Sequence, residues 1–191
     1  MTTRAFYGGG VTAAGSEALA AGEITPAREN IISALAGGPS GNLSLVYFTA
    51  QRTEAINTVT AWAGAAAAAA TPTLIRFGVY EIAADGAGTL VAATANDTTL
   101  FAATNTEYQK SLTATFNKVA RRRYAVGLLV VSASSMPTHQ GLVHSGNTVS
   151  AAFLSLPPRQ SGRLIGLSDL PSSYTDISLT TCVWKIAVRM S

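Results

Sequence analysis

From Leu43 onward the chain alternates short apolar runs with clusters of Gly, Pro, Asn and Asp. This pattern is typical of many short antiparallel strands joined by turns, as in a β-sandwich. The clearest alternation lies in residues 73–82, where Ile75, Phe77 and Val79 are separated by other positions that include Tyr80. Because successive side chains of a strand point to opposite faces, one face should enter a core and the other should meet solvent or a second layer.

Turn residues extend this strand into a hairpin. Asp85 and Gly86 follow it, and residues 88–94 return as a second run of strand character. An Asp-Gly pair between two such runs is a strong short-range hairpin signal. The sequence therefore predicts a hairpin over residues 73–94.

Other runs predict the rest of the sheet. Residues 124–131 are apolar on both faces, which indicates a central strand covered from both sides. Residues 181–190 alternate so that Cys182, Trp184 and Ile186 share one face, which predicts a single last strand. Further strands are expected at residues 43–49, 55–62, 108–115 and 149–154.

An alanine-rich stretch tests this all-β interpretation. Residues 63–70 have high helix propensity, since alanine is the best helix former. A helix this short is marginal in water, and Thr71-Pro72 would end it at once. We therefore expect a loop between two strands.

Residues 1–41 differ in composition and are predicted to be an N-terminal arm, with the sandwich domain in residues 42–191. Within the arm, Thr25 as cap and Pro26 at the first position would suit a short helix over residues 26–35. Two alternatives stay open: the helix packs on its own domain, or it docks onto a neighbouring subunit. The candidate docking residues are Phe6, Tyr7, Ile31, Ile32 and Leu35.

Charge is scarce in this chain. Charged residues make up 12% of the sequence, against about 25% in a typical soluble domain. Thr, Ser and Asn supply the polarity instead, and the cores of interfaces are depleted in charge. The net charge of +3 is too dispersed for a nucleic-acid surface. Residues 121–123 are the one arginine run, so Arg121 and Arg122 are candidates for contact with an anion or a partner.

Candidate chemistry is weak throughout. His139 and His144 have no carboxylate between them, which predicts surface or loop histidines and no metal site. Cys182 is expected in the core and offers neither a disulfide partner nor a nucleophile. Four acids at turn positions are explained by turn chemistry: Asp85, Asp97, Asp169 and Asp176. We predict a protein that is not an enzyme, with no cofactor, no catalytic residues and no insertion into a membrane.

Four stretches carry a resemblance to a known family. They are residues 45–56 (LVYFTAQRTEAI), 70–102 (ATPTLIRFGVYEIAADGAGTLVAATANDTTLFA), 122–138 (RRYAVGLLVVSASSMPT) and 157–173 (PPRQSGRLIGLSDLPSS). Each resembles segments that recur in minor tail proteins and related virion proteins of bacteriophages that infect actinobacteria. The resemblance consists of recurring sequence segments and includes no catalytic signature.

The resemblance implies an antiparallel β-sandwich, expected to be jelly-roll-like, that is displayed on a virion, contacts other virion proteins and is oligomeric. Glycines and polar residues interrupt the N-terminal region, so we expect no signal segment and synthesis in the host cytoplasm. Closed symmetry is the rule for homo-oligomers, and we expect a trimer or a higher ring. The expected role is a minor tail, tail-tip or fibre component. Two alternatives stay open: a capsid decoration or head-fibre protein, and a carbohydrate-binding adhesion module that contacts a host cell-wall glycan.

Overall fold

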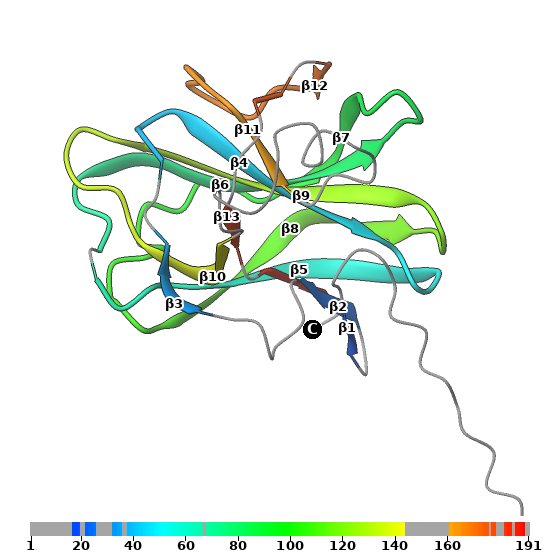
Figure 1. Cartoon of the computed structure of the whole chain (residues 1–191), viewed down its shortest axis with the longest axis horizontal. Helices are drawn as coiled ribbons and strands as arrows, with labels where there is room; N and C mark the ends of the chain where they lie inside the picture. Colours follow the sequence, from blue (N-terminus) through cyan, green and yellow to red (C-terminus); the bar gives the residue numbers. More distant parts are fainter. Residues whose placement is uncertain are drawn as a thin grey trace, which may run out of the picture.

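A computed structural model of the chain describes residues 17–19, 22–25, 32–35, 38–66, 68–143, 161–175, 177–178, 182–184 and 186–189. All regular structure in these ranges is β-strand, and the strands pair antiparallel in three sheets (Figure 1). The described part of the chain is therefore all-β and sandwich-like. The long strand pairs connect residues far apart in sequence, so tertiary packing rather than local turns sets most of the register.

The largest sheet has six strands. Their order is β11 (Ser161–Leu164), β4 (Asn42–Thr49), β9 (Arg123–Ser132), β6 (Pro72–Ile82), β7 (Gly88–Ala93) and β12 (Ser173–Tyr174). The predicted hairpin is confirmed as β6 and β7, with Gly86 at a φ of 92° in the turn between them. The predicted central strand is confirmed as β9, which lies between β4 and β6.

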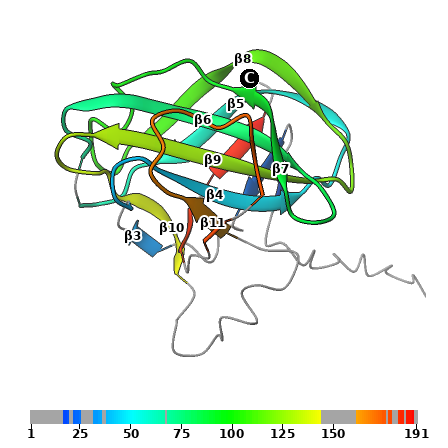
Figure 2. The same cartoon turned by 90° about the horizontal axis from the view of Figure 1, so that it is seen from above.

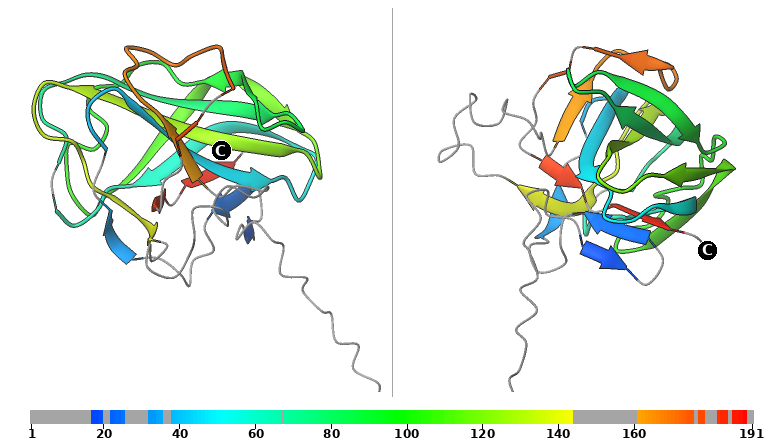
Figure 3. Two further views of the ribbon diagram at one scale, coloured as in Figure 1. Left: turned by 45° about the horizontal axis from the view of Figure 1, so that its top comes forward. Right: turned by 90° about the vertical axis from the view of Figure 1, so that its right-hand side faces the viewer.

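Two smaller sheets complete the fold. The five-stranded sheet has the order β1 (Glu17–Leu19), β2 (Gly22–Thr25), β14 (Ile186–Arg189), β5 (Glu54–Trp62) and β8 (Glu107–Lys118). The three-stranded sheet has the order β13 (Cys182–Trp184), β10 (His139–Val143) and β3 (Ile32–Leu35). Seen from the side, the sheets curl around the core (Figure 3).

The main core lies between the five-stranded and six-stranded sheets. Ile75, Phe77 and Val79 point into it from β6 with no exposed surface, as their alternation predicts. Ile56 and Val59 of β5 face them from the opposite sheet. Burying several large apolar side chains at about 1.5–3 kcal/mol each makes this interface the chief source of stability.

A second core covers the other face of the six-stranded sheet. The segment that runs from β11 to β12 and on to Ser178, which we call the strap, crosses this face (Figure 2). Its Leu167 and Leu170 pack toward the buried side chains of Leu43 and Tyr80. The strap explains why β9 is apolar on both faces and why Tyr80 is buried.

Strand β8 joins the two large sheets at one side. Between two paired positions, residues 112–115 of β8 stand opposite Asn57 alone, so β8 bulges away from β5 by several residues. The bulge lets Leu112 bridge to Thr94, while Thr113 Oγ1 donates a hydrogen bond to the Ala93 carbonyl at 3.0 Å. The five-stranded sheet is thereby tied to the end of β7.

Several sequence expectations change at the chain ends. Residues 26–31 of the expected helix lie outside the described residues, but Ile32–Leu35 is a strand, since it pairs with β10. The expected last strand is divided into β13 and β14, which lie in different sheets. The strand expected at 149–154 lies outside the described residues, whereas residues 43–49, 55–62 and 108–115 fall within β4, β5 and β8.

Candidate functional site

Three turns meet at one end of the molecule, on the right in Figure 1. They are residues 50–53, 83–87 and 119–122, and we call them the hairpin end. Their position follows from register, because Arg123 pairs with both Thr49 and Ile82 at the start of β9. The carboxyl ends of β4 and β6 therefore lie beside the turn that enters β9.

Hydrogen bonds hold two of these turns rigidly together. Ala50 N donates to the Arg122 carbonyl at 2.9 Å, and Arg121 N donates to the Ala50 carbonyl at 2.7 Å. Ala120 N donates to Thr53 Oγ1 at 2.9 Å. The 119–122 turn is therefore fixed by backbone contacts with residues 50–53.

A buried cation lies directly beneath this end. The side chain of Lys118 has no exposed surface, and its Nζ lies 2.8 Å from Glu54 Oε1 in an ion pair. The same Nζ donates a hydrogen bond to the Arg52 carbonyl at 2.9 Å. Arg52 Nη2 lies 3.7 Å from Glu54 Oε2 and donates to the Gly22 carbonyl at 3.3 Å, which connects β2 to this end.

The two predicted contact arginines lie side by side in the chain but differ in surroundings. Arg122 is committed to an ion pair with Glu81. Arg121 is exposed, and its φ of 68° is in the left-handed region that side chains seldom adopt. Within the described residues, Arg121 has no ion pair. Beside it, Val119 keeps 41% of its surface exposed.

A second polar surface lies on the outer face of the five-stranded sheet. Trp62 Nε1 donates a hydrogen bond to Glu107 Oε2 at 3.0 Å, and Arg189 Nη2 lies 3.5 Å from Glu107 Oε1. In the amide orientation that suits its neighbours, Gln109 Oε1 accepts from Arg189 at 2.7 and 3.0 Å. Thr60, which pairs with Gln109 between β5 and β8, is fully buried. We call the group of Trp62, Glu107, Gln109 and Arg189 the Trp62 platform; in it an indole ring lies beside carboxylate, amide and guanidinium groups.

The predicted docking residues of the arm are divided by the structure. Phe6, Tyr7 and Ile31 lie outside the described residues. Ile32 pairs with Gly141 in the three-stranded sheet. Leu35 is 3% exposed and belongs to the main core of its own chain.

His139 is buried in a strand, although the sequence predicts a surface or loop histidine. It lies in β10, is 2% exposed, and meets the ring of Phe101 edge-to-face with centroids 4.7 Å apart. Burial lowers the pKa of its imidazole from 6.5 to about 3, so the ring is neutral at pH 7. His144, Asp176 and the side chain of Cys182 lie outside the described residues.

Metal ligands do not gather in the described part of the chain. There, no three His, Cys, Asp or Glu side chains lie close enough to hold an ion. Asp85 and Asp97 each accept a backbone hydrogen bond from the residue two positions on, at 3.0 Å, as turn residues do. Across the described ranges, no helix has the length and apolar character that spanning a membrane would require.

Comparison with known proteins adds no family. No protein-family model matches the chain, and no curated protein matches it either.

Sequence reasoning found Arg121 and Arg122 but missed most of the site around them. Lys118 and Glu54 become partners only through the register of β5 and β8. Trp62, Glu107 and Arg189 come from three strands, so no local spacing connects them. One local sequence signal for this surface was an apolar residue, Val119, next to the arginine run.

Proposed function

We propose that this chain is a structural protein of a bacteriophage particle, either a minor tail protein or a tail-tip or fibre component. It assembles with neighbouring virion proteins as a trimer or a higher ring and presents a surface to the host. The proposal takes the fold as a jelly-roll-like sandwich that carries an N-terminal arm, and it assigns the chain no catalysis and no cofactor.

One observation carries the proposal. The four stretches that resemble phage tail proteins are scattered over the sequence, but they contribute residues to every strand of the six-stranded sheet, and only residues 54–56 reach the five-stranded sheet, in β5. The last stretch also supplies most of the strap that covers this sheet. Segments that pack into one layer of the fold support the proposal that they belong to a shared structural module.

The exposed strand surfaces also suit assembly. Five exposed side chains of β8 carry amide or hydroxyl groups and no charge: Gln109, Ser111, Thr113, Thr115 and Asn117. Such groups are less costly to bury in an interface than charged groups. A surface of this kind can be buried against a neighbouring subunit without leaving charged side chains unpaired.

The test is the composition of purified particles. A peptide tag on the C-terminus of the chain, followed by gradient purification and quantitative mass spectrometry, should give a fixed copy number of three or more per particle. A matched control particle, assembled with the gene deleted, should lack the chain and lose infectivity or tail integrity. Recovery of the chain only in the soluble lysate would overturn the proposal.

The Trp62 platform supports a second candidate, a carbohydrate-binding module for adhesion. Aromatic rings stack on sugar rings, and planar polar groups bind their hydroxyls. Titration with wall oligosaccharides, followed by tryptophan fluorescence, should show saturable binding that Glu107→Gln weakens. Control variant Thr115→Ala, on the β8 bulge, should bind normally; absence of any fluorescence change would exclude this candidate.

A further inference from the structure

The structure assigns a second contact surface to the hairpin end: we propose that Val119 and Arg121 dock onto a carboxylate-bearing surface of a different, acidic subunit in the same particle. This inference rests on the proposed function for the particle that supplies the neighbour. It specifies the partner's chemistry and the residues that bind it.

The first argument is the charge balance of this end. Five cationic side chains gather there: Arg52, Lys118, Arg121, Arg122 and Arg123. Glu54 and Glu81 form ion pairs with these cations, whereas Asp85 accepts a hydrogen bond from Ala87 N within its own turn. Lys118 is buried, and the exposed Arg52 and Arg122 each lie near a carboxylate. Within the described part of the chain, Arg121 is the exposed cation of this end that has no ion pair.

The second argument is the backbone of Arg121. A left-handed φ of 68° is unfavourable for arginine, whereas glycine or asparagine would adopt it readily. Residues held in this backbone region cluster at binding sites and switch regions, and Arg121 is one that lies in an exposed turn. The turn does not need this guanidinium, because its contacts with Ala50 use backbone atoms.

The third argument is the apolar neighbour. Among the described residues, Val119 and Ile165 are the two large apolar side chains that are clearly exposed. Arginine is enriched in protein interfaces, and burial of the neighbouring valine would add apolar contact to the charge pairing. A polyanion such as nucleic acid would need a longer cationic stripe.

Charge disfavours a second copy as the occupant. The chain carries a net charge of +3, and five of the six acids whose side chains the structure describes are in ion pairs, with Asp85 as the exception. Ion pairs occupy Glu54, Glu81, Asp97, Glu107 and Asp169. A copy of the same chain therefore offers few carboxylates, and charge complementarity favours a different, acidic subunit.

The decisive experiment uses Arg121→Lys, which keeps the charge and places a primary amine at the apex. Treatment of assembled particles with a water-soluble carbodiimide joins amines to adjacent carboxylates. Peptide mapping should find position 121 linked to an Asp or Glu of another protein. The matched control is Arg163→Lys, exposed on β11, which should give no such link.

Arg121→Asn separates docking from folding. Asparagine tolerates the left-handed backbone, so the variant should melt about 2–4 °C higher than wild type. Its incorporation into particles should fall about tenfold, whereas Arg121→Lys should incorporate normally. A lower melting temperature, equal incorporation, or links from position 121 only to a second copy would each overturn the inference. If wild type is itself missing from particles, the proposed function fails instead.

Discussion

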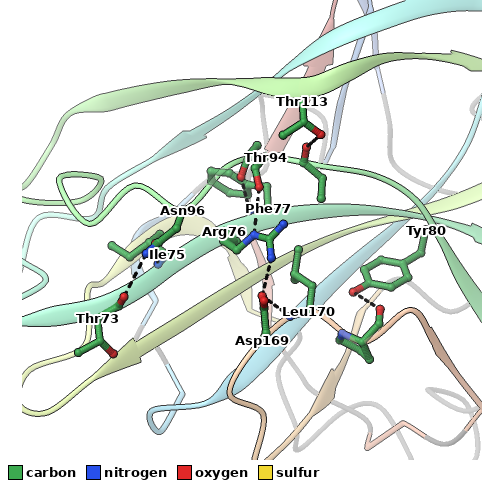
Figure 4. Close-up of polar contacts among 12 residues, drawn as sticks. Thr73, Ile75, Arg76, Phe77, Tyr80, Thr94, Asn96, Thr113, Asp169 and Leu170 are labelled. Atoms are coloured by element: carbon green, nitrogen blue, oxygen red, sulfur yellow. Dashed lines mark hydrogen bonds and ion pairs between the residues drawn. The ribbon is translucent and has the colours of Figure 1, made fainter.

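The hydroxyl groups of Tyr47 and Tyr174 form a buried hydrogen bond of 3.1 Å between residues 127 positions apart in the chain. Tyr47 lies on β4 and Tyr174 on β12, so this bond fastens the strap to the outer face of the six-stranded sheet. The Tyr174 ring packs against Tyr80 with centroids 5.3 Å apart. Burial raises the pKa of both Tyr80 and Tyr174, and the Tyr80 hydroxyl donates a hydrogen bond to the Pro171 carbonyl at 3.2 Å (Figure 4).

Substitution of Tyr174 should weaken the packing of the strap on the six-stranded sheet. Tyr174→Phe deletes one hydrogen bond and should lower the free energy of unfolding by about 0.5–1.5 kcal/mol. Tyr174→Ala also leaves a cavity beside Tyr80 and should cost about 3–5 kcal/mol. Urea denaturation followed by circular dichroism measures both values, and equal costs would show that the ring does not pack here.

Gly88 provides an independent check on the same packing. A Cβ at this position would lie 2.3 Å from the Tyr174 ring, which is far inside van der Waals contact. Gly88→Ala should therefore destabilise the protein in the wild-type background and be much milder in Tyr174→Ala. Additive costs in this double-mutant cycle would contradict the contact.

Stability should depend on His139 at acid pH. Its folded pKa of about 3 is below the ordinary 6.5, so the unfolded chain takes up the proton first. The contribution is fully present above about pH 6.5 and is lost as the pH falls toward 3, at up to about 1.4 kcal/mol per unit. Chemical denaturation between pH 7 and 4 measures this slope.

The control is His139→Gln, which cannot titrate. Protonation of carboxylates also reduces stability in this range, so the informative quantity is the difference in slope between the variant and wild type. Identical slopes would show that His139 is accessible to protons in the folded state.

Replacing Glu54 and replacing Lys118 should lower the stability of the protein by different amounts, although the two residues form one ion pair. Lys118 has no exposed surface, while the Glu54 side chain keeps 22% of its surface in contact with water. Glu54→Gln removes the countercharge of a fully buried ammonium and should cost about 3–5 kcal/mol. Lys118→Met should cost less, and the double variant less than Glu54→Gln alone. Thermal melts of the three variants give this order, and a reversed order would contradict the burial of Lys118.

Truncation should show that residues 1–16 and the rest of the predicted arm contribute differently to the melting temperature. A variant lacking residues 1–16 keeps every described strand and should melt within about 2 °C of wild type. A variant lacking residues 1–41 loses β1, β2 and β3, together with the buried Leu35. It should melt at least about 8 °C lower. Equal melting temperatures would show that these strands contribute nothing to the fold.

Much of the fold could be predicted where local pattern and tertiary packing agree. The alternation of Ile75, Phe77 and Val79 identified the face of β6 that enters the core. The two-sided apolarity of residues 124–131 predicted cover on both faces of β9. The covering strap could not be predicted, because the irregular segment around Leu167 and Leu170 has no strand period.

Pairing between distant segments decided the remaining differences. Residues 26–35 carry helix-start signals, but Ile32–Leu35 pairs with β10, and strand pairing outweighs weak local propensity. Residues 181–190 alternate as one strand, yet the chain passes from one sheet to another between Trp184 and Ile186. His139 is surrounded in sequence by polar and small residues, and only pairing with distant strands buries it.

We propose above all that the chain is a structural component of a phage particle and is held there by contacts between subunits. A cryo-electron microscopy reconstruction of purified particles tests it most directly, because location, copy number and neighbours come from one map. The account predicts density for the six-stranded sheet and its strap at the tail or tail tip, repeated with threefold or higher symmetry. Its hairpin end should face an acidic neighbour. A complete particle map without this fold would contradict the account.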